Sequence, residues 1–289
     1  MAPETALKLS FFPGCSLATS ARESLESLYR VCRTLGLELI ELEDWNCCGS
    51  SSAHSLDQDL ALNLAARNLS LAPPGRPLMT ACPSCLKNLH SAHLHLAADA
   101  KRQSALQRRW GRPLDSDLQI VSFLEIMHFL QIMEKMRPQA DLAKPPGLNG
   151  LKVAPYYGCM LARPKRLRRS FQVRDLMKTA IGSLGGEALT WEHRDRCCGT
   201  FLAAARPDVT TPLVNRIMEG ALLVEADCLV TACAMCQLNL EIRSTIKNPL
   251  PTLHFTEVLA LALGAKCEDS WFSRHLVDPR PLLSRRGLF

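Results

Sequence analysis

The feature that most constrains this chain is a pattern of cysteines that occurs twice. In each copy a single cysteine is followed after 31 or 37 residues by an adjacent pair, and after a further 33 or 34 residues by a C-x-x-C pair. The first copy is Cys15, Cys47, Cys48, Cys82 and Cys85, and the second is Cys159, Cys197, Cys198, Cys233 and Cys236. Ten of the thirteen cysteines belong to this pattern, which indicates an internal duplication.

The residues around the cysteines repeat as well. Thr80-Ala81-Cys82 matches Thr231-Ala232-Cys233, and Val121–Glu125 resembles Leu253–Glu257. The segment Pro138–Gly150 contains three prolines and two glycines, as linkers between domains often do. We therefore place a domain boundary in this segment, which gives an N-terminal domain of residues 1–145 and a C-terminal domain of residues 146–289.

Apolar runs alternate with segments of helical periodicity, which predicts parallel sheets. Strands are expected at Leu7–Phe12, Leu37–Leu42, Leu78–Thr80, Leu151–Tyr157 and Cys228–Thr231. Ile120–Met133 reads as a helix, Thr211-Pro212 as a helix start, Lys101–Asp117 as an exposed connection, and Ser270–Phe289 as a tail without clear periodicity. The predicted fold is α/β, with two duplicated Rossmann-like domains whose parallel sheets are related by a pseudo-twofold axis.

The cysteines are expected to gather into two metal sites. In an open parallel sheet the loops after the strands converge on one crevice, and each cysteine segment follows a predicted strand or precedes a predicted helix. Five thiolates per site would bind zinc, copper(I) or an iron–sulfur cluster. Zinc sites use four ligands, commonly from two close pairs, so an iron–sulfur cluster fits this spacing better than zinc.

Composition limits the remaining function classes. No signal peptide and no apolar run of about 20 residues is recognisable, so we expect a cytoplasmic chain with reduced thiols and without a membrane span. The net charge of +6 is not arranged in an aromatic-interleaved basic stripe, which argues against nucleic-acid binding. No strand is followed by G-x-G-x-x-G, so we expect no flavin in this chain.

The duplicated motif, with both copies complete, resembles the cysteine-rich CCG-domain proteins, in particular the family of the B subunits of heterodisulfide reductases. This family includes heterodisulfide-reductase-like B subunits of sulfur oxidisers. The resemblance spans roughly residues 7–260. It implies that each set of five cysteines holds a noncubane [4Fe-4S] cluster, and that a disulfide is bound and cleaved between the two clusters.

The resemblance also implies partners, namely a flavoprotein subunit and a ferredoxin-like iron–sulfur subunit, with a lipoate-binding carrier protein as a further candidate. Other members of the family act as electron relays in flavin-linked dehydrogenase complexes, so a pure relay is the alternative function. A zinc-stabilised interaction protein is a third interpretation. We expect the tail Ser270–Phe289 and the segment Lys101–Asp117 to be candidates for docking.

Several residues outside the motif allow two interpretations. Arg163, Lys165 and Arg166 follow Cys159 closely and could form a basic substrate rim or a solvated helix face. His54 and His193 lie near the adjacent cysteine pairs, where a proton donor or an ordinary hydrogen-bonded histidine is expected. The remaining cysteines lie outside the pattern, and for two of them a role as small buried hydrophobes is expected. They are Cys32 and Cys228, with Cys267 unassigned.

Overall fold

The computed structural model describes residues 7–50, 53–132, 147–162, 175–265 and 269–289. It contains two four-stranded sheets, with strand orders β2-β1-β3-β4 and β6-β5-β7-β8. Every strand pair is parallel, and the second sheet repeats the topology of the first. The predicted α/β fold with duplicated parallel sheets is confirmed. The predicted boundary between residues 145 and 146 lies outside the described residues.

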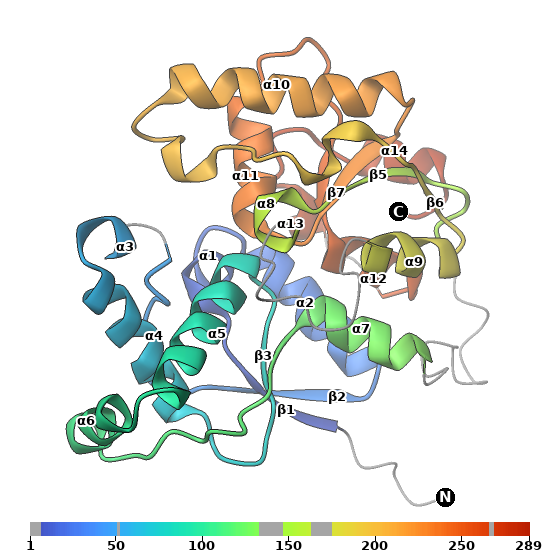
Figure 1. The fold of residues 1–289 in the computed structure, drawn as a ribbon. Helices are drawn as coiled ribbons and strands as arrows, with labels where there is room; N and C mark the ends of the chain where they lie inside the picture. Colours follow the sequence, from blue (N-terminus) through green and yellow to red (C-terminus); the bar gives the residue numbers. More distant parts are fainter. Residues whose placement is uncertain (1–6, 51–52, 133–146, 163–174, 266–268) are drawn as a thin grey trace, which may run out of the picture.

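The first unit comprises the elements before the linker (Figure 1). Its strands are β1 (Leu7–Phe11), β2 (Leu37–Glu41), β3 (Leu78–Thr80) and β4 (Ile120–Ser122). Its helices are α1 (Gly14–Ala18), α2 (Arg22–Thr34), α3 (Ala53–Leu56), α4 (Gln58–Leu71), α5 (Pro83–Ala97), α6 (Ala100–Trp110) and α7 (Phe123–Ile132).

The second unit follows the linker and repeats this order with one helix fewer between β7 and β8. Its strands are β5 (Lys152–Tyr156), β6 (Glu187–Ala188), β7 (Cys228–Thr231) and β8 (Thr252–His254). Its helices are α8 (Gly158–Ala162), α9 (Leu176–Ser183), α10 (Pro207–Leu223), α11 (Ala234–Arg243), α12 (Phe255–Ala262), α13 (Asp269–Phe272) and α14 (Arg280–Arg285). Two short 3-10 helices, Glu192–Asp195 and Thr200–Leu202, flank its adjacent cysteine pair.

Side chains on the strands alternate between two apolar layers, as the two-residue period of a strand requires. In β3, Met79 faces a core that is shared with the second unit, whereas Leu78 faces a core formed only by the first unit. In β7, Val230 faces the shared core and Leu229 faces a core formed only by the second unit. Each sheet is therefore buried on both faces, as is typical of parallel sheets.

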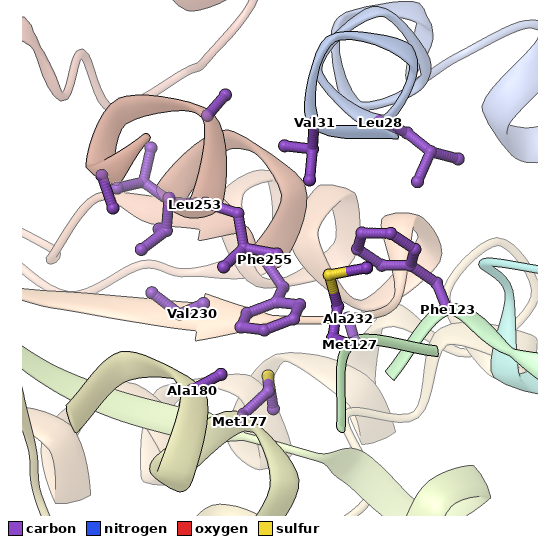
Figure 2. Packing of buried hydrophobic residues seen from close by; sticks show 14 of the residues in the cluster. Leu28, Val31, Phe123, Met127, Met177, Ala180, Val230, Ala232, Leu253 and Phe255 are labelled. Carbon is purple, nitrogen blue, oxygen red and sulfur yellow. The ribbon is translucent and has the colours of Figure 1, made fainter. Parts of the chain in front are cut away.

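The two units exchange helices across the shared core. Helix α12 of the second unit packs against α2, and α7 of the first unit packs against α9. Phe123 and Phe255 are the first residues of α7 and α12, and their rings meet edge to face with centroids 6.3 Å apart. Figure 2 shows side chains from α2, α7 and α9 around Phe255. Equivalent residues meeting in this way place the pseudo-twofold axis near these two rings.

Four local predictions were wrong. Ile120–Ser122 is a strand that precedes α7, and the segment Lys101–Asp117 contains most of α6. Helix α10 begins at Pro207, so Pro212 lies inside it. The tail Ser270–Phe289 contributes to α13 and α14 and packs into the shared core, where Trp271, Phe272 and Leu283 are buried. No helix among the described residues is long and apolar enough to cross a membrane.

Candidate functional site: two five-thiol centres

All six cysteine segments lie at the carboxyl ends of strands. Cys15 lies in α1 directly after β1, and Cys47 and Cys48 lie in the loop after β2. Cys82 is the N-cap of α5, with Cys85 in the first turn. The second unit places its cysteines in the same way, since Cys159 lies in α8, the pair Cys197-Cys198 follows β6, and Cys233 is the N-cap of α11 with Cys236 behind it.

The first centre brings five thiols together. The Sγ atoms of Cys48 and Cys85 lie 3.3 Å apart, and those of Cys15 and Cys47 lie 4.0 Å apart. Cys82 shares a hydrogen bond with Cys85. Three segments that are distant in sequence therefore contribute sulfur to one place.

The second centre has the equivalent contacts. The Sγ atoms of Cys159 and Cys197 are separated by 3.5 Å, and those of Cys198 and Cys236 by 3.6 Å. Cys233 shares a hydrogen bond with Cys236. The duplication of the sequence thus corresponds to a duplication of the thiol arrangement.

Packing thiols against one another changes their acidity in pairs. Hydrogen bonds from Cys47 and Cys85 lower the pKa of Cys48, and a hydrogen bond from Cys236 lowers the pKa of Cys198 to about 7. The same contacts raise the pKa of Cys85 and of Cys236, which are the partners that keep the proton. Each buried pair can therefore give up a first proton easily but resists losing a second unless a cation replaces it.

Backbone groups support the sulfurs equally in both centres. The Gly49 N–H donates to Cys47 Sγ over 3.4 Å, and the Gly199 N–H donates to Cys197 Sγ over 3.3 Å. Both glycines have a φ of +77°, in the left-handed region that favours glycine. The left-handed turn directs each N–H toward the sulfur of the residue two positions before it.

Two asparagines hold the adjacent cysteine pairs in place. Asn88 Nδ2 donates to the carbonyl of Cys48 over 3.1 Å, and Asn239 Nδ2 donates to the carbonyl of Cys198 over 2.8 Å. Both asparagines belong to the sequence repeat, but no role was predicted for them. Their equal spacing after each C-x-x-C pair was the signal that could have identified them.

The two centres differ in one aromatic residue. Tyr156 occupies the position equivalent to Phe12, three residues before the first cysteine of its set. Its hydroxyl donates to the carbonyl of Arg196 over 2.6 Å, and burial raises the pKa of this hydroxyl above its usual range. The second centre is therefore bordered by a buried hydroxyl where the first has only a hydrocarbon ring.

The centres lie on either side of one interface. Helix α1, which carries Cys15, packs against α11, which carries Cys236. By the same symmetry α8, which carries Cys159, packs against α5, which carries Cys85. Each unit's first cysteine thus lies on a helix that touches the C-x-x-C helix of the other unit, and Figure 1 shows these four helices grouped between the two sheets.

Each centre has an open side and a closed side. Cys15 is exposed and Cys47, Cys159 and Cys197 are half-buried. The other six site cysteines are buried, and they are Cys48, Cys82, Cys85, Cys198, Cys233 and Cys236. A group bound by the buried thiols would therefore be reachable from the side of the single cysteine.

The donor set fits an iron–sulfur cluster better than a single ion. Within the described ranges no three His, Cys, Asp or Glu side chains are arranged around one point as ligands of a single metal ion. A multi-iron cluster is bound at separate irons, so its thiolates need not converge on one atom. Five thiols from three segments, with N–H donors directed at sulfur, match that requirement.

The other residues selected from the sequence lie in varied surroundings. Arg163, Lys165, Arg166 and Cys267 lie outside the described residues, as does the side chain of His54. The His193 ring stacks on Trp191, with centroids 6.4 Å apart. Cys32 and Cys228 are buried in the shared core, as expected, and burial raises the pKa of both thiols.

Comparison with protein-family models identifies a match to the CCG cysteine-rich domain over residues 9–90 and 153–241. The matched residues contain both copies of the cysteine pattern. Each match covers one of the two units, which agrees with the duplicated topology.

Two curated relatives align over nearly the whole chain. The 8-methylmenaquinol:fumarate reductase membrane anchor subunit of Wolinella succinogenes is 30% identical, over 95% of this chain and 99% of that protein. Among the B subunits of heterodisulfide reductases, that of the ferredoxin/F420H2-dependent CoB-CoM heterodisulfide reductase of Methanosarcina acetivorans is 24% identical, over 96% of each chain. Both relatives are components of reductases.

A solved structure has the same fold. The crystal structure of a hypothetical protein from Helicobacter pylori superposes with a TM-score of 0.71 over 94% of this chain, at 15% sequence identity. This chain spans about half (52%) of that structure's length. The similarity therefore concerns the architecture of the two sheets.

Proposed function

The chain belongs to the family of CCG cysteine-rich domain proteins and is homologous to the B subunits of heterodisulfide reductases, and we propose that it is a heterodisulfide-reductase-like iron–sulfur subunit of a multi-subunit oxidoreductase complex. One observation carries the proposal. Two equivalent sets of five thiols lie on helices that pack together at a single interface. A structural metal site needs neither the duplication nor the facing arrangement.

The cofactors in this proposal are two noncubane [4Fe-4S] clusters. Cys15, Cys47, Cys48, Cys82 and Cys85 would hold one, and Cys159, Cys197, Cys198, Cys233 and Cys236 the other. The clusters would supply storage for electrons at two neighbouring positions. The N–H groups of Gly49 and Gly199 stabilise sulfur that carries more negative charge, so they favour the reduced state of each centre.

The facing centres support two-electron thiol–disulfide chemistry. Splitting a disulfide yields two thiolates, and each leaves faster when its negative charge is stabilised. Two centres across one interface would place a stabilising group next to each sulfur. In this proposal Arg163, Lys165 and Arg166 form a rim that orients acidic groups of the substrate, since they follow Cys159 by only a few residues.

A second candidate function is that of an electron relay in a flavin-linked dehydrogenase complex. The observation that favours it is the 30% identity to a component of a fumarate reductase, which exceeds the 24% identity to the heterodisulfide reductase relative. A relay needs the same two clusters but no disulfide substrate. The geometry and the identities therefore point to different reactions, and an assay of substrate must separate them.

The partners proposed for both functions are a flavoprotein subunit and a ferredoxin-like iron–sulfur subunit. For the disulfide chemistry, a lipoate-binding carrier protein is a further candidate. This chain has no recognisable flavin motif, so electrons would enter or leave through another protein of the complex. A cytoplasmic location completes the proposal, because reduced thiols are needed to assemble the clusters.

The first experiment measures metal content. Protein purified anaerobically should contain about eight irons per chain, from two four-iron clusters. Cys198→Ser should remove the iron of the second centre alone, while the spectrum of the first remains. The matched control is Cys32→Ser, since Cys32 is buried outside both centres and its change should leave the iron content intact. Two zinc ions and no iron would refute the proposal.

The second experiment separates the two reactions. The iron-loaded chain is reduced with a chemical donor and offered an acidic disulfide such as oxidised lipoate, and the released thiols are counted. Thiol release that is lost in Cys198→Ser and in Cys48→Ser supports disulfide chemistry. Full electron transfer to a flavoprotein partner without any thiol release supports the relay.

A further inference from the structure

Two adjoining cavities lie between α4, α5 and α6 on the outer side of the first unit. One measures about 480 Å³ and the other about 330 Å³. Asp59, Leu62 and Arg102 line both, so the two form one continuous depression, which we call the α4–α6 groove. A groove of this size accepts a peptide segment or a molecule of similar volume.

The groove has an apolar floor and a cationic rim. Leu62, Ala66 and Leu106 contribute hydrocarbon to the floor. Lys87, Arg102 and Arg109 contribute three cations to the lining, against the single carboxylate of Asp59. Helix α6 adds the exposed Lys101 and Arg108 beside the groove and contains no acidic residue. Such a surface is complementary to a segment that is both acidic and apolar.

The groove lies against the first thiol centre. Asn88 and Ala61 line the larger cavity. Asn88 donates to the carbonyl of Cys48, and Ala61 packs so closely on Gly49 that a Cβ added there would lie 3.2 Å from the Ala61 Cα. A molecule in the groove would therefore contact the residues that position Cys48 and Gly49.

The second unit lacks the helix that forms the groove. In the first unit α6 is inserted between α5 and β4. In the second unit α11 ends at Arg243 and β8 begins at Thr252, and the intervening residues, all described, form no helix. The groove is thus a departure from the pseudo-twofold symmetry, and it distinguishes the first centre from the second.

We propose that the α4–α6 groove binds an acidic, amphipathic segment of a partner protein and thereby brings that protein next to the first thiol centre. The proposal rests on the proposed role of the chain as one component of a complex. The apolar floor would receive the hydrophobic side chains of the segment, and Arg102 and Arg109, about two turns apart on α6, would pair with its carboxylates.

A peptide suits the groove better than an anionic bilayer does. A bilayer surface is broad and would meet the exposed cations of α6, but it would leave the recessed floor between α4 and α5 uncovered. The apolar residues that make the floor, Leu62 and Leu106, are reached only by a narrow occupant. The cations at the rim and the hydrocarbon below it are therefore satisfied together by an amphipathic segment.

The test uses the iron-loaded full chain and a fluorescein-labelled helical peptide of glutamate and leucine. Binding is followed by fluorescence anisotropy at two salt concentrations. The double variant R102E/R109E should weaken binding about tenfold or more, because like charges then face each other across the groove. Its matched control is R216E/K247E, which reverses two exposed cations of the second unit and should bind the peptide as the parent chain does.

Two further measurements decide between the outcomes. A peptide with glutamine in place of glutamate should bind weakly to all variants, and vesicles containing phosphatidylglycerol should not be retained better by the parent chain than by R102E/R109E. Equal peptide binding by the parent chain and R102E/R109E, or loss of vesicle binding alone, would overturn the proposal. Iron content is measured in every variant, so failure of the groove is distinguished from failure of the cluster proposal.

Discussion

At the residue scale the two centres depend on glycines that place backbone close to sulfur. Gly14 precedes Cys15 and has a φ of +74°, and a Cβ added there would lie 2.9 Å from Cys85 Sγ. Gly158 is its counterpart, where the added Cβ would lie 3.5 Å from Cys236 Sγ. The first centre is thus the more tightly closed by its glycine.

Gly14→Ala should therefore damage the first centre. The substitution incurs about 1–2 kcal/mol for the left-handed backbone, as any alanine does there. It also pushes a methyl group into Cys85 Sγ, so the iron of the first centre should be lost. The measurements are iron content and denaturant unfolding of the anaerobic protein.

The control for this change is Gly36→Ala. Gly36 has a φ of +70° with no atom within 4 Å of the added Cβ, so this variant carries the backbone strain without the collision. It should lose a similar amount of backbone stability and retain its iron. Equal iron loss in both variants would mean that strain, not contact with sulfur, disturbs the centre.

At the element scale a buried ionic cluster fastens the C-terminal segment to two helices. His275 Nδ1 lies 2.9 Å from Glu241 on α11, and its Nε2 lies 3.1 Å from Glu257 on α12. Arg274, the preceding residue, pairs with Glu23 on α2 over 3.5 Å. Burial lowers the pKa of His275, but the two carboxylates outweigh burial and raise it to about 10.

The cluster makes folding stability depend on pH. The folded-state pKa of His275 lies above the unfolded value of about 6.5, so its contribution is fully present below pH 6.5 and is lost as the pH rises through about 10. Stability of the parent chain should fall between these values by up to about 1.4 kcal/mol per pH unit. Unfolding of His275→Gln, measured from pH 6 to pH 10, should show a flatter slope. Parallel slopes for both proteins would contradict the assignment of the proton to His275.

The same scale shows why some elements were predicted and others were not. The strands β1, β3 and β7 are apolar runs that end at cysteine turns, so their position could be read directly. Strand β4 was missed because Ile120–Ser122 continues into the apolar helix α7 without glycine or proline between them. Helix α6 was missed because only Leu106 is buried, although Asp99 caps its start and Gly111 ends it in the left-handed region.

The candidate centres were predicted from a topological rule. Loops at the carboxyl ends of parallel strands converge, so cysteines in those loops had to lie close together. The rule does not say how two such units pack against each other. The exchange of α7 and α12 depends on long-range fit between apolar faces, which no local pattern of these helices records.

The tail was misjudged for a similar reason, and its burial leads to a prediction. Phe272 is fully buried and its ring meets Phe289 with centroids 5.5 Å apart, whereas Leu276 is 64% exposed. Phe272→Ala should cost about 3–5 kcal/mol, and Leu276→Ala less than about 0.5 kcal/mol. Denaturant unfolding of both variants checks this. Deletion of the whole tail should unfold the chain, so a well-folded truncated protein would show that the tail is dispensable for the core.

At the scale of the whole molecule, the shared core joins the two units into one folding unit. Its residues come from both sheets, and α12 and α7 each lie across the helix of the other unit. The outer cores belong to one unit each, with Leu69 in the first and Ile217 in the second. A substitution should therefore act on one unit or on both according to the layer in which it lies.

Phe255→Ala tests this at the centre of the shared core. Phe255 is fully buried among side chains of α2, α7 and α9 (Figure 2), so the cavity should cost about 3–5 kcal/mol. Because both sheets rest on this core, hydrogen exchange should accelerate in β1 and β3 as well as in β5 and β7. Ile217→Ala opens only the outer core of the second unit and should accelerate exchange chiefly in β5, β7 and α10. If Phe255→Ala left the protection of β1 and β3 unchanged, the two units would fold separately, and the facing of their thiol centres would depend on docking of two finished domains.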